Sequence, residues 1–129
     1  MNRPQPLGRL SLEIVRVLWE AGEASAAQVG EALPLSFRRA PTTIATMLQK
    51  LEKKGVVHHR REGRQFVYRP LVSEEEIRAG MIADLTEQMF GGDTAQLVQH
   101  LVDEAELDES TLDALRAKIA ERKAEESGE

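Results

Sequence analysis

The stretch from Ala40 to Tyr68, APTTIATMLQKLEKKGVVHHRREGRQFVY, decides the fold of this chain. Pro41 suits the first position of a helix, where its missing N–H costs nothing, and Gly55 suits the position just past a helix end. The β-branched and aromatic residues that follow predict two strands, 56–61 and 64–69. The stretch therefore predicts a helix that runs directly into a β-hairpin.

The predicted helix has two distinct sides when its residues are placed on a wheel at about 100° per residue. The apolar side, expected to face the core, consists of Ile44, Met47, Leu48 and Leu51. The opposite side carries hydroxyls near the N-terminus and amide or ammonium groups further along: Thr42, Thr46, Gln49, Lys50 and Lys53, with Thr43 at the flank. Such a face is typical of a recognition helix that enters the DNA major groove by its first turns, because hydroxyl and methyl groups can contact base edges.

The hairpin is basic, and Glu62-Gly63 is predicted to form its turn. Threonines and lysines alone often only cover an exposed helix. A basic two-stranded wing beside the helix favours DNA binding, since it can reach adjacent phosphates or a minor groove. The candidate DNA-binding residues are Arg39, Pro41, Thr42, Thr43, Thr46, Gln49, Lys50, Lys53, Arg60, Arg61 and Arg64.

Two further helices are predicted upstream. Apolar residues at helical spacing begin at Leu10 and stop before Gly22, which predicts the first helix. Ser25 with Gln28 has the spacing of a capping box, which predicts a second helix that ends at Pro34. Three helices followed by a hairpin make a winged helix-turn-helix. The fold class expected is therefore mainly α with a small β-hairpin wing.

The composition changes after Val72. Ser73 with Glu76 has the spacing of a second capping box and should start a helix that ends at Gly91-Gly92. Asp93 is expected to cap the next helix. The last helix is expected to begin at Asp108 or Ser110. Three helices of this size make a thin core, so their apolar stripes favour docking on a second copy, although they could instead pack on the first half. The candidate dimerisation residues are Ile77, Met81, Leu85, Met89, Phe90, Leu97, Val98, Leu101, Leu112, Leu115 and Ile119.

Charge is divided between the same two parts of the chain. Residues 1–72 hold 12 Lys/Arg and 6 Asp/Glu, a net charge of +6, whereas residues 73–129 hold 5 and 16, a net charge of −11. The overall charge of −5 therefore conceals a basic half that suits nucleic acid and an acidic half with another task.

Other classes of protein have little support. There are no cysteines, so no disulfide is expected. The apolar run from Leu10 to Trp19 is interrupted by Glu13 and Arg16, so no membrane span is expected there. The protein is therefore expected to be cytoplasmic. His58 and His59 should point to opposite faces of a strand, which argues against a shared metal ion. No catalytic or phosphate-loop motif is present, so we expect neither an enzyme nor a cofactor.

The sequence resembles the BlaI/MecI/CopY group of bacterial winged-helix repressors. The matching blocks follow in order along most of the chain: Leu18-Trp19-Glu20 with Gly22, Pro41–Thr46, Leu51–Gly55, Gly63–Tyr68, Phe90-Gly-Gly and Leu97-Val98.

This resemblance implies a homodimer, with a winged-helix DNA-binding domain over 1–72 and a helical dimerisation domain over 73–129. It implies repression of transcription at dyad operators with TACA/TGTA-like half-sites. Thr43 and Thr46 would contact bases, while Thr42, Lys50 and Arg64 would hold the backbone.

Two departures from the group concern how DNA is released. The copper-responsive branch carries cysteine pairs near its C-terminus, which this chain lacks, so copper sensing is not expected. The β-lactam-responsive branch is cleaved at an Asn-Phe bond, where this chain has His100-Leu101. A regulatory protease and an unknown inducer both remain open as partners. A winged-helix adaptor for another protein, or a small-molecule-responsive regulator of another winged-helix family, are the alternative functions.

Overall fold

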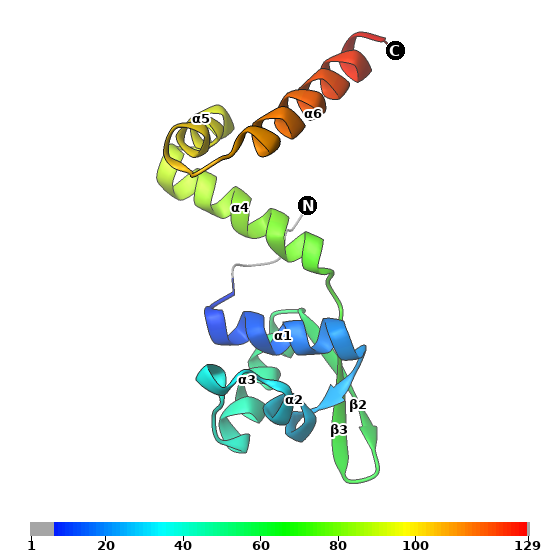
Figure 1. The fold of residues 1–129 in the computed structure, drawn as a ribbon. Coiled ribbons are helices and arrows are strands. Elements are labelled where there is room, and N and C mark those ends of the chain that lie inside the picture. Colours follow the sequence, from blue (N-terminus) through cyan, green and yellow to red (C-terminus); the bar gives the residue numbers. More distant parts are fainter. Residues whose placement is uncertain (1–6, 129) are drawn as a thin grey trace.

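The computed structural model describes residues 7–128, so the ends of the two predicted domains at residues 1–6 and 129 lie outside the described residues. The elements, in order, are α1 (Arg9–Ala21), β1 (Ala24–Ser25), α2 (Ala26–Ala32), the 3₁₀ turn η1 (Leu35–Phe37), α3 (Pro41–Lys53), β2 (Val57–Glu62), β3 (Gln65–Pro70), α4 (Glu74–Phe90), α5 (Thr94–Glu104) and α6 (Glu109–Gly128) (Figure 1). A winged helix followed by three helices was the predicted fold class, and it is confirmed.

Both predicted capping boxes are present. Ser25 Oγ accepts from Gln28 N at 3.2 Å while Gln28 Oε1 accepts from Ser25 N at 2.9 Å. Ser73 and Glu76 make the same pair of bonds at 3.0 and 2.9 Å. Each box satisfies two backbone N–H groups near a helix N-terminus, which is why this short sequence pattern starts α2 and α4 at the predicted residues.

The predicted breaks in the second half also hold. Gly91 and Gly92 both adopt positive φ, and Asp93 caps α5 through a bond from Gln96 N at 3.2 Å. Asp108, rather than Ser110, caps α6.

The hydrophobic core lies where α1, α2 and α3 meet the small sheet. Ile44 and Leu48 of α3 are fully buried, Leu51 is 2% exposed, and Met47 is partly buried against them, so the wheel assigned the inner side of α3 correctly. The other buried apolar residues are Leu7, Ile14, Val15, Leu18, Ala24, Val29, Leu33, Val56, Val57, Val67, Tyr68 and Ile77. This core holds α3 with its polar side outward.

The sheet differs from the prediction in two respects. It has three strands in the order β1-β3-β2. The two-residue β1, which the sequence did not predict, pairs with β3. The pairing of Glu62 with Gln65 leaves Gly63-Arg64 as the turn, so the predicted turn was wrong by one residue. Gly63 has φ of 63°, and a two-residue turn with positive φ at its first central position favours glycine there.

The chain leaves the winged-helix part through α4 and continues into α5 and α6, which project away from it (Figure 1). Trp19 Nε1 donates to the carbonyl of Val72 at 2.8 Å, just before α4 begins. Ile77 is 2% exposed and Met81 is partly buried, both against the core. The chain itself therefore covers two candidate dimerisation residues, Ile77 fully and Met81 in part, because the start of α4 follows β3 closely and lies against the core. No helix of the described part is long and apolar enough to cross a membrane.

Candidate nucleic-acid interface

Every side chain selected as a DNA contact is exposed. The set comprises Arg39, Pro41, Thr42, Thr43, Thr46, Gln49, Lys50, Lys53, Arg60, Arg61 and Arg64. The residues of α3 in this set form its outward side, opposite the buried Ile44, Leu48 and Leu51. Exposure makes these residues available to DNA, and their contact with it stays a prediction.

The N-terminal end of α3 is open to a negatively charged group. The helix begins at Pro41, and Ala40, the residue before it, provides no side-chain cap. The helix dipole and unpaired N–H groups make such an end favourable for phosphate. Lys50 and Lys53 occupy the last turn, where they complement the negative end of the dipole.

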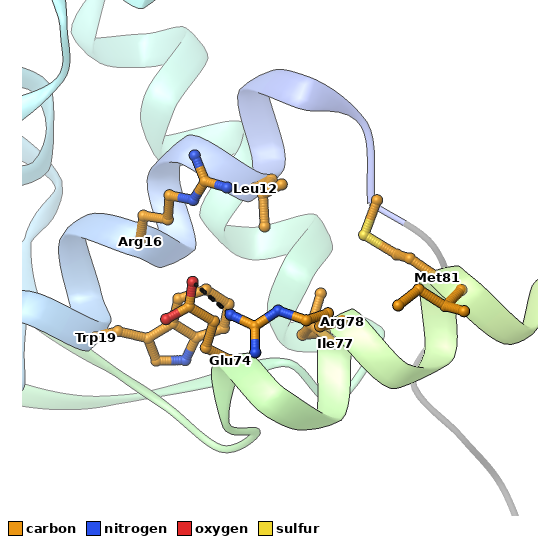
Figure 2. A pocket seen from close by; sticks show the side chains of 8 residues that line it. Leu12, Arg16, Trp19, Glu74, Ile77, Arg78 and Met81 are labelled. Carbon is orange, nitrogen blue, oxygen red and sulfur yellow. Dashed lines mark ion pairs between the residues drawn. The ribbon is translucent and has the colours of Figure 1, made fainter. Parts of the chain in front are cut away.

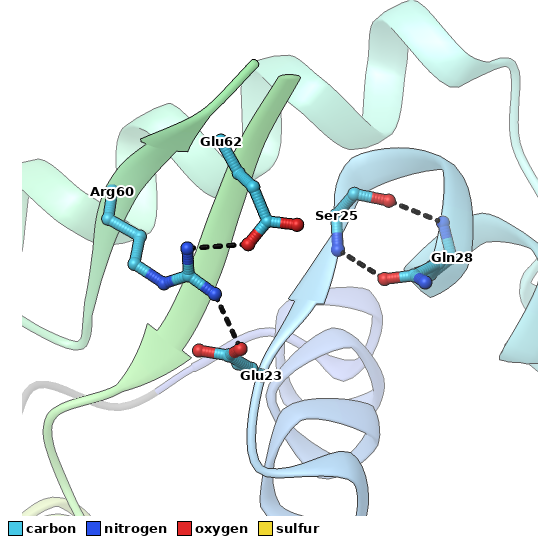
Figure 3. A network of polar contacts seen from close by, with 5 residues as sticks. All are labelled: Glu23, Ser25, Gln28, Arg60 and Glu62. Atoms are coloured by element: carbon cyan, nitrogen blue, oxygen red, sulfur yellow. Dashed lines mark hydrogen bonds and ion pairs between the residues drawn. The ribbon is translucent and has the colours of Figure 1, made fainter. Parts of the chain in front are cut away.

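Arg60 is held by two carboxylates, which the sequence did not predict (Figure 3). Its Nη2 lies 2.7 Å from Glu23 Oε2 and its Nη1 lies 2.6 Å from Glu62 Oε2. The hydrogen bond from Arg60 holds the pKa of Glu23 below its ordinary value, and Glu23 and then Glu62 raise the pKa of Arg60. Surface pairs of this kind add little stability. They nevertheless occupy the guanidinium and tie the wing to the segment before β1.

The two other arginines near the wing tip are arranged differently. The Arg61 guanidinium lies over the Phe66 ring at 5.8 Å from its centroid. Arg64 sits in the turn itself, is exposed, and has no side-chain partner among residues 7–128. Of the three, Arg64 is therefore the cation most available to a phosphate.

A polar cluster joins the C-terminal end of α3 to the wing. His59 Nδ1 donates to Glu52 Oε1 at 2.6 Å, and His58 Nδ1 lies 3.2 Å from Glu52 Oε2. The hydrogen bond from His59 lowers the pKa of Glu52. Burial raises the pKa of Tyr68, and the negative charge of Glu52 adds to this. The His59 ring also packs on Phe66 and Tyr68, with centroids 4.4 and 5.6 Å apart.

The two histidines were expected to be separated by the strand, yet both contact Glu52. β2 is an edge strand, so one carboxylate beside that edge can be reached by side chains from both faces. In the described part of the chain, no group of three or more metal-binding side chains is placed to hold an ion.

A crevice of about 200 Å³ lies between α2, α3 and the wing. It is lined by Ser25, Ala26, Ala27, Ala45, Gln49, Gln65, Phe66 and Tyr68. The crevice brings Gln49 of α3 beside Gln65 and Phe66 of the wing, and Phe66 is 41% exposed. Sequence reasoning did not select Gln65 or Phe66, because the register that pairs Phe66 with Arg61 differs by one residue from the predicted turn and appears only in the structure.

An outward polar helix beside a basic wing, carried on a three-helix core, defines the class of this protein as a winged-helix DNA-binding protein. Residues 7–121 match the family model described as penicillinase repressor, and the chain belongs to that family. The resemblance to BlaI and MecI repressors is thereby confirmed.

Individual relatives cover most of the chain. It is 35% identical to the transcriptional regulator BlaI of Mycobacterium tuberculosis over 120 residues, which span 92% of this chain and 86% of that protein. It is 26% identical to the penicillinase repressor of Bacillus licheniformis over 123 residues, 95% of this chain and 96% of the relative. The solved DNA-binding domain of the repressor BlaI is 34% identical with a TM-score of 0.51, covering 59% of this chain and 93% of that one.

Proposed function

We propose that the protein represses transcription as a homodimer on a pseudo-palindromic operator. Each copy places α3 in the major groove of one half-site and its wing on the flanking backbone. Thr43 and Thr46 contact base edges, while Thr42, Lys50 and Arg64 contact phosphates. The observation that carries this proposal is the exposed polar side of α3 beside the basic wing, in a chain of the penicillinase repressor family.

Exposed apolar side chains on the acidic helices support the dimer. Eight large apolar residues of α4, α5 and α6 are 39–67% exposed: Ile82, Leu85, Met89, Val98, Leu101, Val102, Leu115 and Ile119. Phe90, Leu97 and Leu112 beside them are only partly covered. An apolar surface of this extent favours a second copy as its partner. The net charge of −11 on residues 73–129 keeps these helices away from DNA and leaves binding to the basic half.

The base contacts are tested by Thr46→Glu in gel-shift titrations, with a duplex first selected by the protein from a random DNA pool. Removing a base contact should weaken operator binding by roughly 5- to 150-fold, and the added negative charge should weaken it further. The preference for the selected sequence should also fall. Thr111→Glu is the matched control, because Thr111 is an exposed threonine near the start of α6. Equal binding by the two variants would refute the proposed interface.

The dimer is tested separately by Leu101→Glu, which places a charge in the exposed apolar side of α5. Sedimentation equilibrium should show a monomer, and operator binding should fall because the two half-sites are no longer linked. Leu35→Glu is the control: Leu35 is 82% exposed but lies in the winged-helix part. A Leu101→Glu variant that remains dimeric would rule out this side of α5 as the contact.

A further inference from the structure

A cavity of about 290 Å³ lies between α1 and the first turns of α4, apart from every residue proposed to contact DNA (Figure 2). Leu12, Arg16 and Trp19 line it from α1, and Glu74, Ile77, Arg78, Met81 and Ile82 line it from α4. Its volume equals that of roughly ten water molecules in the liquid. That space suits a molecule of one or two rings, at the lower end of the usual size of ligand sites.

The inner surface of this cavity is apolar and well supported. Ile77 is 2% exposed, and Leu12 and Met81 are partly buried against the core. The indole of Trp19 is held in place by the hydrogen bond from its Nε1 to the Val72 carbonyl at 2.8 Å. A flat apolar group can therefore bury its faces here without disturbing the packed core.

Two arginines supply positive charge at the same cavity, one from each helix (Figure 2). The Arg78 side chain is 61% exposed, and its Nη2 lies 3.5 Å from Glu74 Oε2. The Arg16 side chain is 49% exposed and bonds Glu13 at 2.9 Å. Exposed ion pairs within one helix contribute little to stability. A ligand carboxylate that binds an arginine bidentately can therefore replace the glutamate partner of that arginine or bind beside it.

We propose that this cavity binds a small aromatic carboxylate. The ring lies against Trp19, Ile77 and Met81, and the carboxylate bonds Arg16 and Arg78. An apolar inner surface lined by one arginine from each helix matches this chemistry, whereas a neutral molecule would offer neither guanidinium a charged partner. The site goes beyond operator binding, since it assigns a ligand to the junction between the DNA-binding part and the helices that follow.

The test uses the full chain with 1-naphthoate as the probe and 1-naphthamide as its neutral counterpart. Trp19 is the one tryptophan of the sequence, so its indole N–H resonance reports directly on the cavity. We expect 1-naphthoate to shift this resonance saturably and to bind at least roughly tenfold more tightly than the amide, because only the carboxylate forms charge-assisted bonds. The titration contains no DNA, so its failure is distinguishable from failure of the repressor function.

Matched variants identify the arginines responsible. Arg78→Gln and Arg16→Gln should each reduce naphthoate affinity toward that of the amide. Arg116→Gln should leave it unchanged, because Arg116 is also an exposed helical arginine, 3.5 Å from Asp113, but lies on α6. Equal affinities for naphthoate and naphthamide would overturn the proposal. So would equal reductions in the Arg78 and Arg116 variants, or binding that saturates without moving the Trp19 resonance.

Discussion

Replacing Arg64 with alanine should flatten the salt dependence of operator binding, and replacing Arg60 should do so clearly less. The two arginines are only four residues apart in the wing, but their surroundings differ. Arg64 is exposed in the turn, whereas the Arg60 guanidinium already bonds Glu23 at 2.7 Å and Glu62 at 2.6 Å. Only a cation that contacts phosphate releases counterions from DNA when the complex forms.

The magnitude follows from the number of phosphates that the variant no longer neutralises. Each neutralised phosphate adds about 0.9 to the slope of log K against log salt concentration, so two copies of Arg64 in a dimer account for about 1.8. Between about 50 and about 200 mM salt, the unaltered protein should therefore lose roughly 12-fold more affinity than the Arg64→Ala variant. The weakening should be similar for specific and unrelated duplexes, because phosphate contacts carry no sequence information.

Fluorescence anisotropy of a labelled operator, titrated at several salt concentrations, measures these slopes, and circular dichroism confirms that both variants are folded. An Arg64→Ala slope equal to that of the unaltered protein would refute the phosphate contact. A slope that flattens equally in the Arg60→Ala variant would show that Glu23 and Glu62 do not neutralise Arg60 as the structure indicates.

Three further predictions concern stability, each measured by urea denaturation. Leu48→Ala removes a fully buried side chain and should lower the free energy of unfolding by about 2–5 kcal/mol, whereas the exposed Gln49→Ala should change it by less than about 0.5 kcal/mol. Ser73→Ala removes one bond of the α4 capping box and should cost about 1 kcal/mol; an unchanged free energy would mean that the cap is redundant. The hydrogen bond from His59 lowers the pKa of Glu52 in the folded state. Its contribution to the free energy of unfolding is therefore fully present at pH values above the ordinary pKa of 4.5, and it disappears as the pH falls through the lower folded pKa. The unaltered protein should therefore lose more stability on acidification than Glu52→Gln, and parallel decreases would contradict this linkage.

Helix boundaries could be predicted because their causes are local. Ser25 and Ser73 each lie three residues before the side chain that completes the capping box, so both partners are visible in a short window of sequence. The periodicity of α3 likewise identified Ile44 and Leu48 as inward facing, since burial of one side of a helix follows its repeat. The exposed side of α3, which forms most of the candidate interface, followed from the same repeat.

Contacts between distant segments could not be predicted in this way. The bond between Arg60 and Glu23 joins residues 37 positions apart, and that between Trp19 and Val72 joins residues 53 positions apart. No periodicity links such partners, because their proximity arises only when β3 lies between β1 and β2 and α4 turns back over α1. For the same reason, Ile77 looked like one more residue of an unpaired helical stripe, although it belongs to the core.

The sequence by itself determined the winged-helix architecture, the polar side of α3 and the division of charge, since each depends on residue spacing or composition. Only the tertiary structure decided which cations remain available to DNA, which apolar side chains of α4 are already covered, and that a cavity with two arginines opens between α1 and α4. These properties depend on distances between side chains from separate elements, and such distances exist only after the helices and the sheet have packed together.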